Sequence, residues 1–306
     1  MNLKEQLYIV TIAECRSITK AAERLHVSQP ALSAFVGNIE NAMDVRLFDR
    51  FSREMVPTYS GELYIHAAKQ MLLLKSEFDE MLSDLRGDYK GRFRIGMQRR
   101  RSPLIMPSLY REFSAIYPNV ELFFVEDVIE LLEEMLAENE LDLILCNKIH
   151  EMKAFEYVTI AGERLLLATS PEQPLVGSAV RGADSPHEWI DLRLFEGKTF
   201  VLQRPDQTQR ILSDTLMKKL KVTPGHTIEV QNIETSTRMS ALGIGVSFAL
   251  ETYAKHFRFE PEPRYFMVGS TSDQEGHTAE FVAVRKKGSY MPTYVETAID
   301  IVKKNL

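Results

Sequence analysis

The strongest constraint on the fold lies near the N-terminus, where two helical segments are separated by only a few residues. Residues 19–25 predict a short helix, because small and apolar side chains recur there at helical spacing. Ser28 then provides a good N-cap for the next helix. Pro30 falls in the first turn of that helix, where a missing N–H group is tolerated. Two helices joined by so short a turn indicate a helix-turn-helix.

A further helix is predicted before this pair. Asn2 and Glu5 have the spacing of a capping box, with Asn in the usual place of Ser or Thr. We expect this first helix to bury a stripe made of Leu3, Leu7, Val10 and Ile12. We expect the helix after the turn to bury Leu32, Val36 and Ile39.

Between Glu62 and Leu85 the chain has no Pro or Gly, and apolar side chains recur at heptad spacing. A helix that is polar outside one apolar stripe usually buries that stripe against a partner helix. Packing against the chain's own body is the alternative, but a small N-terminal module cannot cover so long a stripe. The residues expected at a dimer interface are Tyr64, Met71, Leu74, Phe78, Met81 and Leu85.

Beyond a hinge at residues 87–91, strand-like and helix-like segments alternate along the chain. This alternation is typical of a parallel or mixed sheet with helices on its faces. Asn139 stands where a helix must stop and can adopt the left-handed conformation. The expected strands are residues 93–97, 121–125, 141–146, 165–169, 199–202, 245–250 and 279–284. The expected helices are residues 103–117, 128–138, 207–220, 235–242 and 292–304.

The composition is that of a soluble globular protein, with 44% hydrophobic and 26% charged residues. The net charge of -6 gives no basic footprint for nucleic acid, so any DNA contact must come from locally placed side chains. The first residues do not resemble a secretory signal, and no apolar run approaches the roughly 20 residues of a membrane helix. We therefore expect a cytoplasmic protein that does not enter a membrane.

The two cysteines match no metal or redox spacing. Cys15 and Cys146 are expected to be reduced thiols of a cytoplasmic protein, and no metal or cofactor site is expected.

A dense run of landmark residues begins at Ser17 and ends at Gly61. It comprises Ser17, Ala21, Ala22, Leu25, Ser28 to Ser33, Ile39, Glu40, Leu47, Phe48, Arg50, Arg53, Thr58 and Gly61. Weaker landmarks follow at Arg94 to Gly96, Phe113, Tyr117, Pro118, Leu141 to Leu143 and Gly243 to Gly245. In this order the residues resemble the LysR-type transcriptional regulator family over essentially the whole chain.

The resemblance implies an α+β multidomain chain. A winged helix-turn-helix would occupy residues 1–60, and a linker and dimerisation helix with its hinge would occupy residues 61–90. Residues 91–306 would form an effector-binding domain of two α/β lobes, similar to periplasmic solute-binding proteins. Lobe I would comprise about residues 91–161 and 267–306, and lobe II about residues 162–266.

The resemblance also implies partners and a mechanism. The partners would be double-stranded promoter DNA, a small-molecule effector, RNA polymerase and further copies of the chain, as a homodimer or homotetramer. The effector would shift the packing of the lobes and so the geometry of the paired DNA-binding modules.

The helix after the turn is the expected reader of DNA, with its first turn in the major groove. Gln29 can bond to a base edge or a phosphate, and Ser33 lies one turn later on the same face. Arg50 and Arg53 fall in the hairpin that would form the wing, where guanidinium groups can clamp phosphates or enter the minor groove. Thr58 is expected to cap the following helix or to bond a phosphate. The full expected set is Ser28, Gln29, Pro30, Ser33, Ala34, Arg50, Arg53 and Thr58.

One departure from the family concerns the residues after Ser33. The family commonly has polar side chains there, whereas this chain has Ala34, Phe35 and Val36. Ala34 or Phe35 could instead contact a thymine methyl group. For each polar residue taken singly, a solvated surface position is the alternative.

The effector pocket is expected between the lobes, near strand ends and helix N-termini. Residues 99–101 are three consecutive arginines, which suit a carboxylate or phosphate. We therefore expect an anionic metabolite, held by at least one of these arginines together with Ser102 and with Thr235 or Ser236. The alternative is that the arginines face solvent or a neighbouring subunit. The expected lining is Gln98, Arg99, Arg100, Arg101, Ser102, Asp127, Val128, Asn147, Gln203, Arg204, Thr235 and Ser236.

Two other classes of protein share the α/β pattern. An enzyme is disfavoured, because the chain has no nucleophile elbow, no Walker-type phosphate loop and no cluster at metal-ligand spacing. A freestanding solute-binding protein would need export and would not need residues 1–85. Oxidant sensing through paired cysteines is disfavoured, since Cys15 and Cys146 belong to different expected domains.

Overall fold

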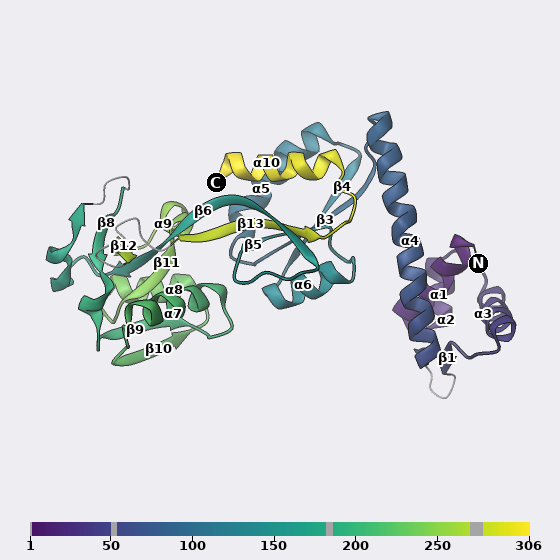
Figure 1. Ribbon diagram of the computed structural model, residues 1–306, viewed down its shortest axis with the longest axis horizontal. Coiled ribbons are helices and arrows are strands. Elements are labelled where there is room, and N and C mark those ends of the chain that lie inside the picture. Colours follow the sequence, from purple (N-terminus) through teal and green to yellow (C-terminus); the bar gives the residue numbers. More distant parts are fainter. Residues whose placement is uncertain (1, 50–53, 182–185, 270–277) are drawn as a thin grey trace. The chain divides into compact units, whose positions relative to one another are not determined.

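The computed structural model describes residues 2–49, 54–181, 186–269 and 278–306. The chain divides into two compact units, residues 1–89 and residues 90–306 (Figure 1).

The first unit contains the predicted helix-turn-helix. Its described elements are α1 (Leu3–Cys15), α2 (Ile18–Arg24), α3 (Gln29–Met43), the short antiparallel strands β1 (Phe48–Asp49) and β2 (Val56–Pro57), and α4 (Tyr59–Arg86). The capping box at α1 is confirmed: Glu5 N donates to Asn2 Oδ1 and Asn2 N donates to Glu5 Oε2, both at 2.9 Å. The side chains of Ser17, Ser28 and Thr58 cap α2, α3 and α4.

The buried face of α1 differs from the prediction. Val10 and Ile12 are buried as expected, but Leu3 and Leu7 are 40% and 46% exposed. The buried face instead includes Gln6, which is fully covered, because α1 packs beside α4 along that side. The predicted stripe counted only apolar side chains and therefore missed the buried polar residues Gln6 and Thr11. In α3, Leu32 and Val36 are buried and Ile39 is partly buried, as expected.

Two landmark residues join α3, the hairpin and α4. The buried carboxylate of Glu40 accepts hydrogen bonds from the backbone N–H groups of Leu47 (2.8 Å) and Phe48 (3.2 Å). Gly61, in the first turn of α4, lies so close to the same segment that a Cβ atom there would be 2.0 Å from the Leu47 carbonyl oxygen. Only glycine permits this approach.

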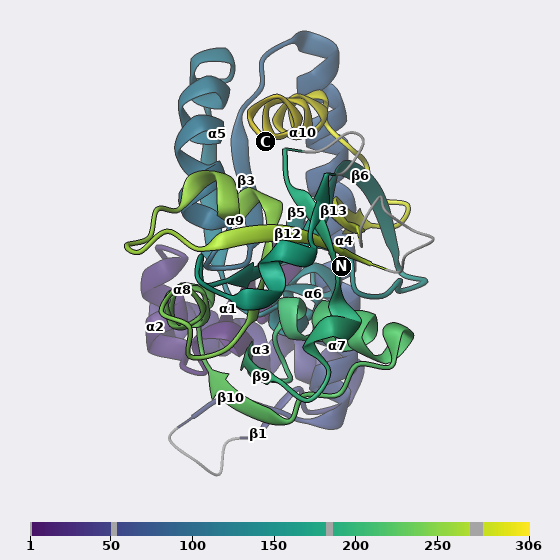
Figure 2. The ribbon, with the colours of Figure 1, turned by 90° about the vertical axis from the view of Figure 1, so that its left-hand side faces the viewer.

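The second unit has two lobes (Figure 1). In the first lobe, β3 (Gly91–Met97) pairs in parallel with β4 (Val120–Glu126) and β5 (Leu143–Asn147). The connections contain α5 (Ser102–Ile116) and α6 (Ile129–Ala137), and α10 (Thr293–Asn305) lies beside α5 (Figure 1, Figure 2). Asn139 has φ 62°, which confirms the left-handed conformation expected after α6.

The second lobe has strands β7 (Val180–Arg181), β8 (Glu188–Asp191), β9 (Thr199–Gln203), β10 (His226–Val230), β11 (Ser247–Leu250) and β12 (Arg264–Gly269). Its α-helices are α7 (Thr208–Leu220), α8 (Ile233–Ala241) and α9 (Glu251–His256), and short 3₁₀ turns lie at Pro174–Ser178 and Leu192–Phe195. β9 and β10 pair in parallel. The chain stays with this lobe up to Gly269, slightly beyond the expected boundary at residue 267.

Two long strands join the lobes (Figure 1). β6 (Phe155–Thr169) pairs with β13 (Thr278–Lys286) along its first ten residues and with β11 and β12 along its last part. The register of the β6–β13 pair shifts between Phe281 and Val282, the mark of a bulge. The sequence indicated only residues 165–169 of β6. The predicted combination of helix-turn-helix, long helix and α/β domain is confirmed.

Candidate DNA-reading helix and effector pocket

The first turn of α3 presents the predicted DNA-reading residues at the surface. Gln29, Pro30 and Ala34 are exposed, and Ser33 is half-buried. The Ser28 hydroxyl accepts a hydrogen bond from Ala31 N at 3.4 Å, so this side chain caps the helix. Because the opposite face of α3 enters the core, the outer face is free to meet another molecule.

Phe35 and Thr58 have structural partners. The Phe35 ring packs edge-on against Tyr8 of α1, with ring centroids 5.1 Å apart, so Ala34 is the more exposed of the two apolar residues. The Thr58 hydroxyl accepts from Gly61 N (3.0 Å) and donates to the Arg46 carbonyl (2.6 Å), so its capping role is confirmed. Arg50 and Arg53 lie outside the described residues.

The apolar stripe of α4 is exposed from its middle onwards. Tyr64 is only 6% exposed and belongs to the core of residues 1–89, so its assignment to the dimer interface is corrected. The first turns of α4 pack against α1, which covers that position. The stripe beyond it is uncovered within the unit, at Met71, Leu74, Phe78, Met81 and Leu85.

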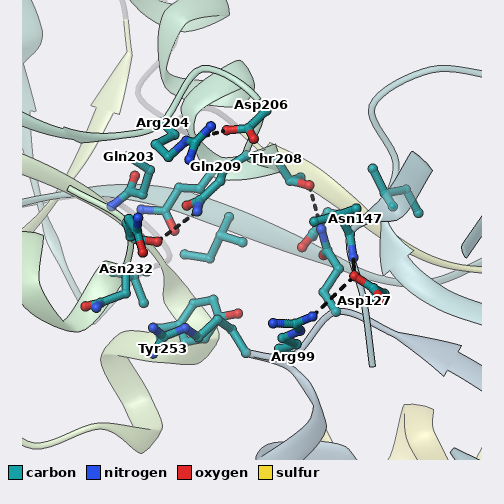
Figure 3. Close-up of a pocket in the computed structure, with 18 residues that line it drawn as sticks. Arg99, Asp127, Asn147, Gln203, Arg204, Asp206, Thr208, Gln209, Asn232 and Tyr253 are labelled. Atoms are coloured by element: carbon teal, nitrogen blue, oxygen red, sulfur yellow. Dashed lines mark hydrogen bonds and ion pairs between the residues drawn. The ribbon is translucent and has the colours of Figure 1, made fainter. Parts of the chain in front are cut away.

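A pocket of about 420 Å³ lies between the two lobes of the second unit (Figure 3). From the first lobe it is lined by the segments that follow β3, β4 and β5. From the second lobe it is lined by the segments that follow β9 and β10 and by the starts of α7 and α9. Both lobes thus contribute the carboxyl ends of parallel strands, where α/β proteins bind their ligands.

The structure brings together much of the predicted lining. The predicted residues found on the pocket wall are Gln98, Arg99, Arg100, Asp127, Val128, Asn147, Gln203 and Arg204. Arg101, Ser102, Thr235 and Ser236 do not line it.

Arg101 is buried and does not line the pocket. Its side chain is 0% exposed and forms a bidentate ion pair with Glu163 of β6, with Nη1 donating to Oε1 at 2.7 Å. Its Nη2 also donates to Asn147 Oδ1 at 2.9 Å, and its guanidinium stacks over Phe281 with 4.5 Å to the ring centroid. Contrary to the expectation, Arg101 therefore does not line this pocket, because its buried charge is balanced by the buried carboxylate of Glu163.

The buried carboxylate of Glu163 accepts hydrogen bonds from several side chains besides Arg101. Thr252 Oγ1 and Asn147 Nδ2 also donate to its carboxylate, the latter at 2.6 Å. Burial opposes its ionisation, but the Arg101 charge and these hydrogen bonds outweigh burial and lower the pKa of Glu163. The network thus joins the first lobe, the crossing strand β6 and α9 of the second lobe.

The predicted hydroxyl contacts are also corrected. Ser102 Oγ hydrogen-bonds to Glu126. Thr235 is exposed and does not line the pocket, and its backbone N–H donates to Asn232 Oδ1 at 2.7 Å. Ser236 is fully buried, donates to the Ile233 carbonyl (2.9 Å) and accepts from Gln203 Nε2 (2.7 Å). The serine therefore orients a lining glutamine.

Each arginine on the pocket wall is paired with a carboxylate. Arg99 lies 3.4 Å from Asp127 in the first lobe, and Arg204 lies 3.5 Å from Asp206 in the second, on the other side of the pocket (Figure 3). Arg100 pairs with Glu234 of α8 and so links the two lobes. Gln98 Nε2 makes a second link by donating to Thr208 Oγ1 at 2.6 Å.

The lining residues that the sequence did not predict lie around the starts of α6, α7, α8 and α9. At α6 and α7 they are Ile129, Asp206, Gln207, Thr208 and Gln209. Gln231, Asn232 and Ile233 line the pocket because α8 starts at Ile233, earlier than the expected residue 235. Asn232 was the sequence signal for this earlier start, because asparagine is a favoured N-cap residue and its side chain accepts from Thr235 N. Leu250 and Tyr253 line the pocket at the start of α9. The sequence predicted neither this six-residue helix nor strand β10.

Tyr253 is a neutral hydrogen-bonding group at physiological pH. Burial raises the pKa of its hydroxyl to about 12, although the nearby Arg101 acts in the opposite direction.

Cys146 does not suit redox chemistry. Burial raises the pKa of its thiol to about 12, which suppresses the reactive thiolate. Cys15 and Cys146 are both free thiols in different units. Among the described residues, no group of three or more His, Cys, Asp or Glu side chains could hold a metal ion, and no described helix is long and apolar enough to cross a membrane.

Comparison with known proteins gives the same division of the chain. Residues 3–62 match the family described as bacterial regulatory helix-turn-helix protein, lysR family, and residues 86–306 match the LysR substrate binding domain. The regulator CfxR of Cupriavidus necator is 26% identical over 286 residues, which cover 93% of this chain and 87% of CfxR. The dual regulator OxyR of Escherichia coli is 29% identical over 174 residues, which cover 57% of each chain.

Solved structures share the fold. A variant of full-length OxyR from Pseudomonas aeruginosa has a TM-score of 0.72 at 22% identity and covers 99% of this chain and 98% of its own. Full-length CbnR in complex with its target DNA has a TM-score of 0.53 at 19% identity and covers 100% and 99%. The family models span both units, so the chain belongs to the LysR family of DNA-binding transcriptional regulators with an effector-binding domain.

Proposed function

We propose that a small molecule bound in the pocket between the lobes controls DNA binding by this regulator. The observation that carries the proposal is the position of the pocket: polar groups of both lobes form its wall, and two contacts, Arg100–Glu234 and Gln98–Thr208, cross from one lobe to the other. A ligand that replaces or reinforces these contacts binds one arrangement of the lobes better than another. Such differential affinity is what shifts a conformational equilibrium.

The effector carries an anionic group that Arg99 or Arg100 binds. Both guanidinium groups line the pocket, and their side chains are 71% and 43% exposed. The first turn of α7, which also lines the pocket, has no side-chain cap and no acidic residue, so its backbone N–H groups favour negative charge.

In the first unit, α3 would read double-stranded promoter DNA through Gln29, Pro30, Ser33 and Ala34, with Arg50 and Arg53 contacting the backbone or minor groove. The exposed outer face of α3 supports this assignment. The exposed stripe from Met71 to Leu85 would pair two subunits in a homodimer or homotetramer. The protein would work in the cytoplasm, where promoter DNA and RNA polymerase are found.

DNA binding is tested with a promoter fragment recovered by genome-wide mapping of bound DNA. Fluorescence anisotropy should show salt-sensitive binding, and Gln29→Ala should weaken it about 5- to 150-fold, the range of one bidentate base contact. Asn41→Ala is the matched control, because Asn41 is an exposed amide three turns further along α3. Equal loss of affinity in both variants would refute the assigned face.

Effector control is tested on the same fragment. A metabolite that binds the pocket should change the affinity or the footprint of the wild-type protein, and Arg100→Gln should alter that response. Arg92→Gln provides the control, because Arg92 forms an exposed pair with Glu121 and does not line the pocket. A response that survives unchanged in Arg99→Gln and Arg100→Gln would exclude this pocket as the site.

A further inference from the structure

We propose that the pocket selects a small zwitterion that carries both a carboxylate and an ammonium group, the class of α-amino acids and their close derivatives. This inference rests on the proposed function and narrows the chemistry of the effector beyond an anionic group.

The first argument is the charge of the pocket wall. Its three arginines are matched by Asp127, Asp206 and the adjacent Glu234, each within an ion pair. A ligand carboxylate that takes the place of Asp127 on Arg99 leaves the aspartate beside a second negative charge. An ammonium group on the same ligand removes this repulsion by pairing with the released carboxylate.

The second argument is the orientation of the lining amides. Gln203 donates its Nε2 to Ser236 Oγ, and Gln207 donates its Nε2 to the Gln231 carbonyl at 2.8 Å. The Ser236 hydroxyl already donates to Ile233, so Gln203 must present its nitrogen to this serine. Within the described parts of the chain, no residue donates to the remaining amide oxygens of Gln203 and Gln207. The wall therefore holds acceptors that suit the N–H groups of an ammonium.

The third argument is the distribution of the ion pairs. Arg99–Asp127 belongs to the first lobe and Arg204–Asp206 to the second, on either side of the pocket (Figure 3). A zwitterion held between Arg99 and Asp127 of the first lobe therefore lies opposite an ion pair of the second lobe. The volume of about 420 Å³ is at the small end of ligand pockets, which suits a molecule of this size.

The experiment uses the full chain and three matched sets of probes. The twenty standard α-amino acids are screened at millimolar concentration by thermal shift, and each hit is measured by isothermal titration calorimetry. For each hit, the carboxylic acid without the amino group and the amine without the carboxylate are titrated in parallel. At least one amino acid should bind, and both truncated analogues should bind at least tenfold more weakly.

Asp127→Asn distinguishes a zwitterion from a simple anion, because the substitution should change the affinities for the two ligands in opposite directions. The variant keeps the side-chain oxygen that accepts from Val128 N (2.9 Å) but loses the negative charge beside Arg99. It should bind the amino acid at least tenfold more weakly and the deaminated acid more tightly. Glu121→Gln, which removes the carboxylate of an exposed pair away from the pocket, should change neither affinity.

The outcomes distinguish this inference from the proposed function. If no amino acid binds, or if deaminated acids bind as tightly as amino acids, the zwitterion assignment is overturned. When such an acid nevertheless alters DNA binding through Arg99 or Arg100, the proposed function stands without it. When no probe or cellular metabolite extract alters DNA binding at all, the proposed function also fails.

Discussion

Glu163→Gln removes the charge that balances Arg101 while keeping the shape of the side chain. The pair is almost fully buried, with side chains 0% and 4% exposed, so the variant leaves an uncompensated cation inside the second unit. Two unit charges about 4 Å apart interact by about 4 kcal/mol at an effective dielectric constant of about 20. Removal of one partner from buried pairs typically costs about 3–5 kcal/mol. We expect Glu163→Gln to lower the free energy of unfolding by a similar amount, about 3–5 kcal/mol.

The assay is thermal and urea unfolding of the full chain, followed by the fluorescence of Trp189. This is the single tryptophan of the sequence and is buried in the second lobe, so it reports on residues 90–306. For a unit of this size, the expected loss corresponds to a fall in Tm of about 6–20 °C. Glu121→Gln makes the same chemical change in the exposed pair with Arg92 (side chains 64% and 72% exposed) and should cost less than about 1 kcal/mol.

The same pair predicts a pH dependence. Because the pKa of Glu163 is lowered in the folded protein, its stabilising contribution is present above the pKa of the unfolded chain. The contribution is lost as pH falls through the lower, folded pKa. The difference in stability between wild type and Glu163→Gln should therefore be constant near pH 7 and should shrink progressively below about pH 4.

Two results would refute the reasoning. One is a Glu163→Gln variant as stable as Glu121→Gln at pH 7. The other concerns the double variant Arg101→Met, Glu163→Gln, in which the isolated buried charge is gone. It should recover part of the lost stability, and a double variant even less stable than Glu163→Gln would show that the charge was not the cause.

Three further changes are informative. Gly61→Ala should destabilise residues 1–89 by about 3 kcal/mol, because its Cβ would overlap the Leu47 carbonyl, whereas Gly37→Ala in the open middle of α3 should stabilise them by about 0.5–1 kcal/mol. Hydrogen exchange of the α1–α3 amides measures the difference. Equal protection in the two variants would contradict the close approach of Gly61 to Leu47. Phe78→Asp, at a 56% exposed position of the stripe, should shift the sedimentation profile toward monomer without unfolding the chain. Ser76→Asp, on the opposite side of α4, should leave the profile unchanged. An unchanged profile in Phe78→Asp would show that Phe78 is not part of the subunit contact. Cys146 should react with iodoacetamide at pH 8 about 1000-fold more slowly in the folded protein than in urea, because its raised pKa leaves little thiolate. Mass spectrometry of the labelled peptide measures both rates. Equal rates would mean that burial does not protect the thiol.

The fold was predictable where local sequence and tertiary packing agree. The caps at Asn2, Ser28 and Thr58 and the left-handed Asn139 follow from side-chain chemistry within a few residues of the helix end. Strands β8, β10 and β12 and the first part of β6 escaped prediction. Their identity depends on partners far along the chain, because β6 is fixed by pairing with β13, more than a hundred residues later.

The pocket was predictable in outline and less so in detail. The rule that ligands meet the carboxyl ends of parallel strands located Gln98, Asp127, Asn147 and Gln203 correctly. The rule does not say which of three adjacent arginines turns inward. That choice is decided by Glu163, a charged residue in a strand that the sequence did not reveal as spanning both lobes.

The two crossing strands also limit the kind of motion that an effector can induce. A slip of β6 along β13 by one residue would turn every side chain to the opposite face and break the whole ladder between them. We therefore expect the lobes to rotate, and not to slide past each other along the strands. The register shift between Phe281 and Val282 lies at the ring on which Arg101 stacks, and a bulge bends the strand that carries it. We therefore expect an effector that changes this domain to rotate one lobe against the other, about a pivot near the buried ring of Phe281.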